Sequence, residues 1–171
     1  MRWERLFAEL EAHGDDAELL ERDALVEDLR EEELAGRSWR ESVGDHVQLD
    51  VLGAGRLEGR VLLVTEQLVR LAAGRLDHVV AGHAVTALIG DGGPTPPSTA
   101  VARRLGWGAV LRAARDDGSV VRLVRTTGQA LTGTVEAVGA DAVVLRSGDR
   151  RVTIVLEHLA VLTLGVDDTA P

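Results

Sequence analysis

Hydrophobic and polar residues alternate along the chain from residue 46 onwards. Val47, Leu49 and Val51 take every second position, which is the spacing of a strand that buries one face. Four more short apolar segments follow, separated by glycines or short polar pairs that favour turns. The pattern predicts five strands, over residues 46–52, 57–65, 68–72, 76–81 and 85–89.

The same pattern returns 74 residues later without a gap. Ten identities fall in register: Val47, Leu49, Leu57, Gly59, Val61, Val64, Val69, Leu71, Gly74 and Leu88 match Val121, Leu123, Leu131, Gly133, Val135, Val138, Val143, Leu145, Gly148 and Leu162. A repeat of this kind identifies a structural unit that occurs more than once. We therefore expect a second set of strands from Val120 to about Leu164.

Helical spacing replaces strand spacing ahead of the first repeat. Apolar residues at i, i+3, i+4 and i+7 predict an amphipathic helix: Trp3, Leu6, Phe7 and Leu10. Gly14 ends this helix, and a second helix is predicted from about Ala17 to Glu33. Because Ser38 can cap a further turn, helical structure is expected to lead directly into the first repeat.

A stretch rich in glycine and proline, Gly90 to Pro97, predicts a linker between the repeats. Ser98 or Thr99 can cap a helix after it, with Trp107 on the buried side. These boundaries predict an acidic helical arm over 1–36, a first β unit over 37–90, a linker over 91–98, a second unit with its lead helix over 99–165, and a tail over 166–171.

The net charge of −9 is concentrated in the N-terminal segment. Residues 1–46 hold 15 acidic residues and six arginines, whereas residues 47–171 hold 13 of each. A neutral β region lacks the strongly basic surface that is typical of nucleic-acid binders, and an acidic arm favours protein partners or solubility. The chain has no cysteine and no apolar run of membrane-spanning length, so we expect a cytoplasmic protein that does not cross a membrane.

The repeated residues follow a fixed order of Val, Leu and Gly. The second repeat carries Val121, Leu123, Gly128, Leu131, Gly133, Val135, Val138 and Val143-Val144-Leu145, and the first carries Val47, Leu49, Leu57, Gly59, Val61, Val64 and Leu71. This pattern resembles the first motif of the Sm and Sm-like family, and Val79 to Leu88 is similar to the second motif. The resemblance implies a mainly β fold with an N-terminal helical part, in which two tandem Sm-like bent β-barrels are each preceded by a helix. The opening Trp3 to Phe7 and the acidic arm are also similar to a group of actinobacterial proteins.

The loops depart from the Sm family's pattern. RNA-binding members use an Asp and an Asn in the loop after the second strand, and an Arg-Gly pair in the second motif. This chain has no Asn, although Asp141 stands near the loop position of the second repeat. The Arg-Gly position reads Ala81-Gly82 in the first repeat and Val155-Leu156 in the second. The base-reading chemistry of the family is therefore not carried over to any residue here.

No group of residues has the composition or spacing of an active site. Cysteine is absent, and no Gly-x-Ser-x-Gly, dinucleotide-binding or phosphate-loop motif occurs. Among the histidines only His78 and His83 are close in sequence, and we interpret both as surface or turn residues because a metal site needs three or four ligands. We predict a protein that is not an enzyme and has no catalytic, cofactor-binding or metal-ligating residue.

Two functions remain open. The first is a cytoplasmic binding or scaffold protein that holds a protein partner or a second copy of itself. It would do so through unpaired strand edges or through a helical interface of Leu6, Phe7 and Leu10. The alternative is an RNA-associated, Sm-like regulator that contacts phosphates without reading bases, through Arg103, Arg104, Arg150 and Arg151.

Overall fold

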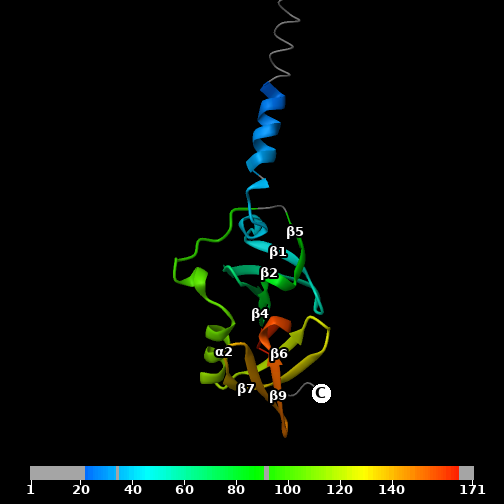
Figure 1. Ribbon diagram of the computed structural model, residues 1–171, viewed down its shortest axis with the longest axis vertical. Coiled ribbons are helices and arrows are strands. Elements are labelled where there is room, and N and C mark those ends of the chain that lie inside the picture. Colours follow the sequence, from blue (N-terminus) through cyan, green and yellow to red (C-terminus); the bar gives the residue numbers. More distant parts are fainter. Residues whose placement is uncertain (1–21, 34, 91–92, 166–171) are drawn as a thin grey trace, which may run out of the picture. The chain divides into compact units, whose positions relative to one another are not determined.

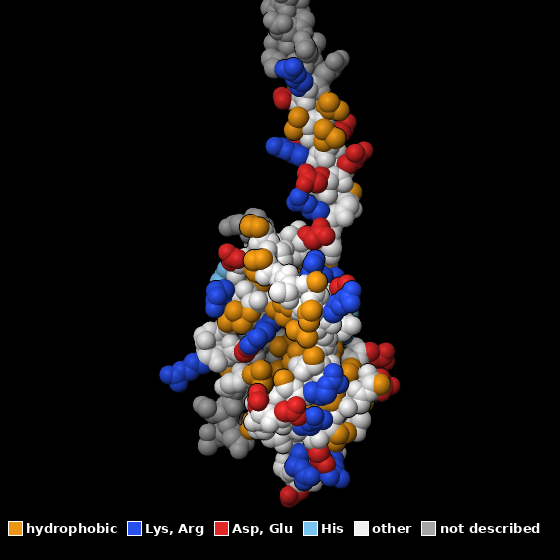
Figure 2. Space-filling model, turned by 90° about the vertical axis from the view of Figure 1, so that its left-hand side faces the viewer, with side chains coloured by type: hydrophobic (Ala, Val, Ile, Leu, Met, Phe, Trp, Pro, Cys, Tyr) orange, Lys and Arg blue, Asp and Glu red, His pale blue; other side chains and the backbone are white. Residues whose placement is uncertain are grey.

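The computed structural model describes residues 22–33, 35–90 and 93–165. The chain divides into two compact units, one ending at Ser38 and one beginning at Trp39. The first unit contains a helix over residues 22–33, inside the range predicted for the second helix. Its apolar side chains are exposed and lie among charged ones (Figure 2). The predicted helical interface of Leu6, Phe7 and Leu10 lies outside the described residues.

The second unit contains two sets of five strands with short helical segments between them (Figure 1). The first set comprises η1 (Trp39–Ser42), β1 (His46–Val51), β2 (Gly55–Val64), β3 (Leu68–Ala73), β4 (Leu76–Ala81), η2 (Gly82–Ala84) and β5 (Val85–Ile89), where η marks a 3-10 helix. The second set comprises η3 (Ala102–Arg104), α2 (Trp107–Asp116), β6 (Val120–Arg125), β7 (Ala130–Val138), β8 (Ala142–Ser147), β9 (Arg150–Val155), η4 (Leu156–His158) and β10 (Leu159–Leu164). The five strands predicted for the first repeat are confirmed, and the second set spans the predicted range.

Both sets pair their strands in the same register, displaced by 74 residues. Gly59 lies opposite Val47 where β1 meets β2, and Gly133 lies opposite Val121 where β6 meets β7. The register also shifts at the same place in both sets, between the second and third strands. The repeat in the sequence is thus a repeat of backbone geometry, including its irregularities.

Glycine is required for space in the second strand of each set. A Cβ at Gly59 would lie 2.6 Å from the carbonyl oxygen of Ala72, and a Cβ at Gly133 would collide with the carbonyl oxygen of Arg146. Neither glycine has a positive φ, so the constraint is the close approach of the neighbouring strand and not an unusual conformation. This explains why both glycines belong to the repeated pattern.

The two sets join edge to edge into one ten-stranded antiparallel sheet, in the order β5-β1-β2-β3-β4-β10-β6-β7-β8-β9. The join lies between β4 of the first set and β10 of the second, where Val80 pairs with Val161 and Val79 with Leu162. The predicted fold of two tandem Sm-like barrels is therefore wrong, although the chain is mainly β. The physical reason is that β4 completes its second row of backbone hydrogen bonds with the other repeat and not within its own.

A helix precedes the second repeat, but it begins later than the sequence suggests. Thr99 caps the short η3, where its Oγ1 accepts a hydrogen bond of 3.1 Å from the backbone N–H of Ala102. The helix α2 starts at Trp107 with Gly106 as its N-cap, and it packs against β7. Directly ahead of β1 the chain forms only the 3-10 helix η1. The expectation of an α-helix leading directly into each repeat therefore holds for the second repeat alone.

One hydrophobic core extends through both repeats. Fully buried leucines come from corresponding strands of the two sets, such as Leu49 and Leu123 in the first strands and Leu71 and Leu145 in the third. The join between the sets is equally buried, since Val80 is inaccessible to solvent and Val161 nearly so. The two repeats consequently behave as one packed body and not as two separate cores.

Candidate functional site

The sheet ends in two unequal edges, β5 from the first repeat and β9 from the second. At the β4–β10 join a fourth strand meets a fifth strand, and the free edges are again one fifth strand and one fourth strand. Ile89 at the end of β5 is 38% exposed and Val155 at the end of β9 is 44% exposed. Open edges with apolar residues favour pairing with another strand, because their backbone groups lack a neighbour.

A buried polar pair lies inside the join. His78 of β4 lies opposite Thr163 of β10, and His78 Nδ1 is 3.0 Å from Thr163 Oγ1. Burial lowers the pKa of His78, while the nearby carboxylate of Asp77 acts in the opposite direction. The prediction that His78 is a surface or turn residue is therefore wrong, since only 9% of it is exposed.

Next to this pair, Asp77 forms an ion pair with Arg70 of β3. The Arg70 Nε donates to Asp77 Oδ1 at 3.0 Å and to Oδ2 at 2.9 Å. The hydrogen bond to Asp77 raises the pKa of Arg70. Because Asp77 also lies opposite Leu164 of β10, this ion pair stands at the margin of the join.

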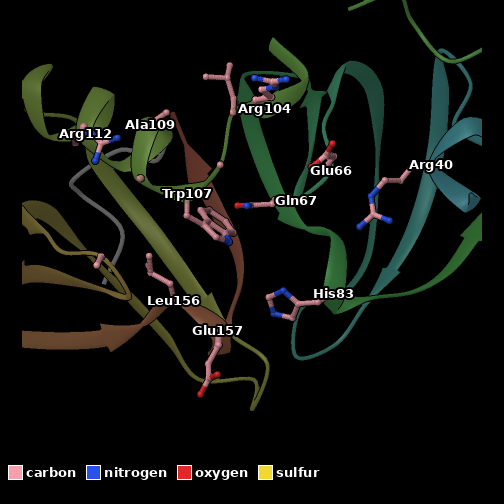
Figure 3. A pocket seen from close by; sticks show the side chains of 14 residues that line it. Arg40, Glu66, Gln67, His83, Arg104, Trp107, Ala109, Arg112, Leu156 and Glu157 are labelled. Carbon is pink, nitrogen blue, oxygen red and sulfur yellow. The ribbon is translucent and has the colours of Figure 1, made fainter. Parts of the chain in front are cut away.

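A cavity of about 580 Å³ lies where the two repeats and their linker meet. The first repeat contributes Gln67 from the β2–β3 loop and His83 from η2, and the linker and α2 contribute Arg104, Trp107 and Arg112. Figure 3 shows Trp107, Gln67 and His83 pointing toward one another into this space. Its volume lies within the range that is common for small-molecule sites.

Two glycines let main chain and side chains approach closely around the cavity. A Cβ at Gly106 would collide with the side-chain amide of Gln67, and one at Gly82 would collide with the guanidinium of Arg40. Backbone hydrogen bonds fix the same region, because Glu66 N–H donates to the Arg103 carbonyl at 3.3 Å. Gly82 N–H donates to the Gln67 carbonyl at 2.7 Å. The cavity is therefore tied to both the linker and the first repeat.

The structure separates the four arginines predicted as phosphate contacts. Arg104 lines the cavity, and it is the only one of the four among the described lining residues. Arg103 lies beside it in η3, whereas Arg150 and Arg151 begin the edge strand β9. Arg151 forms an ion pair with Glu136 of β7, which occupies its charge.

Two further searches of the described residues gave negative results. In residues 22–33, 35–90 and 93–165, no group of three or more His, Asp or Glu side chains gathers so that it could hold a metal ion. None of the helices in the described part of the chain is long and apolar enough to cross a membrane.

Comparison with known proteins does not place the chain in a family. No protein-family model matches it, and no curated protein matches its sequence.

Sequence reasoning missed most of the cavity residues. Gln67, His83 and Trp107 are far apart in sequence and belong to no motif. The available signal was the segment Gly106-Trp107-Gly108, since a tryptophan between two glycines at a helix start indicates a place where other segments approach closely. The free edges were anticipated, although which strands would form them was not.

Proposed function

We propose that this chain is a non-enzymatic scaffold protein that assembles head to tail with further copies of itself through its free edges β5 and β9. We keep the cytoplasmic location expected from the sequence as part of this proposal. The observation that supports it is the β4–β10 join, in which a fourth strand and a fifth strand of the same repeated unit already pair. The free edges offer the same two kinds of strand.

The displacement of 74 residues gives the register that the contact between two copies would take. Val80 corresponds to Ile154 on β9, and Val161 corresponds to Ala87 on β5. Ile154 of one copy is thus expected opposite Ala87 of the next, with Thr153 opposite Leu88 and Val152 opposite Ile89. Such a contact uses a different surface on each side, so successive copies close into a ring or extend into a chain.

Two features of the edges favour this assembly over a monomer. The edge strands carry exposed apolar residues, Ile89 on β5 and Val155 on β9, where isolated sheets are usually protected by charge or proline. Main-chain hydrogen bonds supply much of the affinity when a strand is added to an edge, and alternate side chains supply specificity.

The test blocks one edge at a time with a lysine. Ile89→Lys blocks β5 and Thr153→Lys blocks β9, because an edge lysine opposes strand addition. The wild-type chain is expected to form particles larger than 18.2 kDa at high concentration in analytical ultracentrifugation, and each variant alone is expected to remain a monomer. Mixing the two variants restores one contact, from the free β9 of the first to the free β5 of the second, so the mixture should form a dimer and nothing larger.

Val101→Lys is the matched control, because Val101 is 77% exposed and lies in the linker away from any strand. It should assemble like the wild type. A wild-type chain that stays monomeric throughout the concentration range, or a mixture of edge variants that does not associate, would show that the edges do not join copies of this chain.

The second candidate function is an RNA-associated regulator, favoured by the position of Arg104 in the cavity beside Trp107. Binding through phosphates alone would weaken steeply with salt. An electrophoretic shift with single-stranded RNA at low salt that disappears in Arg103→Gln/Arg104→Gln would support it. A chain that shifts no RNA at low salt does not have this function.

A further inference from the structure

We infer that the cavity between the repeats binds a small phosphate ester that carries a flat ring, held at its phosphate by Arg104 and Arg112. This site is separate from the sheet edges, so it stands or falls independently of head-to-tail assembly. The argument rests on the charges, the aromatic ring and the size of the cavity.

The cavity holds an excess of positive charge. Its charged lining residues are three arginines, Arg40, Arg104 and Arg112, and two glutamates, Glu66 and Glu157. Glu157 is directed toward His158, since its Oε1 lies 3.3 Å from His158 Nε2 and its side chain is 74% exposed. The net charge of the lining therefore favours an anion.

Two of these guanidinium groups are available for a ligand. Six arginines of the described chain form ion pairs: Arg37, Arg56, Arg70, Arg115, Arg146 and Arg151. Arg104 and Arg112 form none with any residue that the structure describes, although both line the same cavity. Arg112 lies over Gly108, where a Cβ would be 3.2 Å from its Nη1, so the glycine gives its guanidinium room.

Phosphate fits this pair of arginines better than carboxylate does. Arg104 comes from η3 and Arg112 from α2, so they approach a ligand from two separate elements. A phosphate monoester offers three acceptor oxygens and close to two negative charges, so it can accept hydrogen bonds from two guanidinium forks at once. A carboxylate offers two oxygens and is satisfied by one fork.

The remaining lining accounts for the ring. Trp107 lies between Gly106 and Gly108 and its side chain lines the cavity together with Gln67 and His83 (Figure 3). An indole ring prefers to stack on or pack edge-to-face with another flat ring, and Gln67 supplies both a donor and an acceptor for polar atoms at the ring's margin. The volume of about 580 Å³ accommodates one such molecule.

The experiment is isothermal titration of the full chain with phenyl phosphate, the simplest member of this class. Saturable binding is expected, with inorganic phosphate binding more weakly because it lacks the ring. Arg104→Gln/Arg112→Gln should weaken phenyl phosphate binding at least about tenfold, the loss expected when charge-assisted hydrogen bonds are removed. Trp107→Phe should weaken phenyl phosphate binding and leave phosphate binding unchanged.

Arg103→Gln/Arg122→Gln is the matched control, because it removes the same charge from η3 and β6 at residues that do not line the cavity. Its affinity should stay within about twofold of the wild type, as expected for long-range charge effects at moderate salt. Equal losses in the two double variants, or no saturable heat with phenyl phosphate, overturn the inference. Single-stranded RNA is the last arm. If RNA binds and loses affinity in Arg104→Gln/Arg112→Gln while phenyl phosphate does not bind, the site belongs to a polymer and the inference is wrong. Thermal melting of each variant separates loss of binding from loss of folding.

Discussion

His78 and Thr163 lie opposite each other across the join between the repeats, with His78 Nδ1 3.0 Å from Thr163 Oγ1. His78 is 9% exposed and Thr163 is 5% exposed, so the pair replaces water for both polar groups. A neutral imidazole is compatible with this site, because burial disfavours the charged form. The join between the repeats is therefore sensitive to the charge of one side chain.

Acid is expected to destabilise the fold through His78. Its pKa is lower in the folded chain than in the unfolded chain, so the unfolded chain binds the proton more readily. The contribution of His78 is complete above its unfolded pKa, near 6.5, and is lost as pH falls from there toward the lower pKa of the folded state. Urea unfolding at a series of pH values should show this fall in the free energy of unfolding. The variant His78→Gln should flatten the profile in that range, and a wild-type profile that rises as pH falls would contradict the mechanism.

Asp77 sets how strongly His78 resists protonation. Its negative charge raises the pKa of His78 against the larger effect of burial. Asp77→Asn should therefore lower the pKa of His78 further, which can be measured from the imidazole proton shifts in NMR. Loss of the half-exposed ion pair with Arg70 should reduce stability by no more than about 1 kcal/mol. Asp116→Asn is a suitable control, since its ion pair with Arg115 lies in α2, away from the join, and should leave the His78 titration unchanged.

Gly53 and Gly55 separate conformational strain from contact between the repeats. Both have positive φ, at 79° and 75°. A Cβ at Gly53 would collide with the backbone of Arg125 and Thr126 in the second repeat, whereas a Cβ at Gly55 meets nothing within 4 Å. Gly55→Ala should cost about 1 kcal/mol from strain alone, and Gly53→Ala about 3 kcal/mol because the repeats must also move apart. Chemical denaturation of the two variants gives the comparison, and equal losses would show that Gly53 makes no critical contact.

The single sheet predicts a single unfolding transition. Leu49 and Leu123 are fully buried at corresponding positions of β1 and β6. Replacing either leucine with alanine should reduce the free energy of unfolding by about 2–5 kcal/mol and move the whole transition, because both belong to one core. Calorimetry that shows two transitions, only one of which moves in each variant, would mean that the repeats unfold separately.

The strands were predictable because their signals are local. Alternation and turn-forming glycines gave Leu76–Ala81 and Val85–Ile89 with the bounds that the structure has. Gly59 and Gly133 were recognised as part of the repeat, and the close approach of the neighbouring strand explains them. Local signals of this kind do not depend on which strand becomes the neighbour.

The assembly of the strands was not predictable in the same way. β4 and β10 are brought together across 85 residues, as the pair His78 and Thr163 shows, and no local pattern encodes that distance. A signal was present in β10, where Leu159 to Leu162 are all buried without a polar alternate. Such a run is typical of a strand covered on both faces in the middle of a sheet. The cavity residues Gln67, His83 and Trp107 depend on the same join, and for this reason the sequence did not reveal them.

The join between non-consecutive strands has a consequence for how the chain is held together. The peptide between β5 and α2 takes no part in the pairing of β4 with β10, so its covalent continuity serves mainly to keep the two halves at a high local concentration. A chain cut in this segment would be held as a noncovalent complex of two complementary fragments. The folded unit is in this sense already a dimer of its own repeats, one whose subunits share a single translation start.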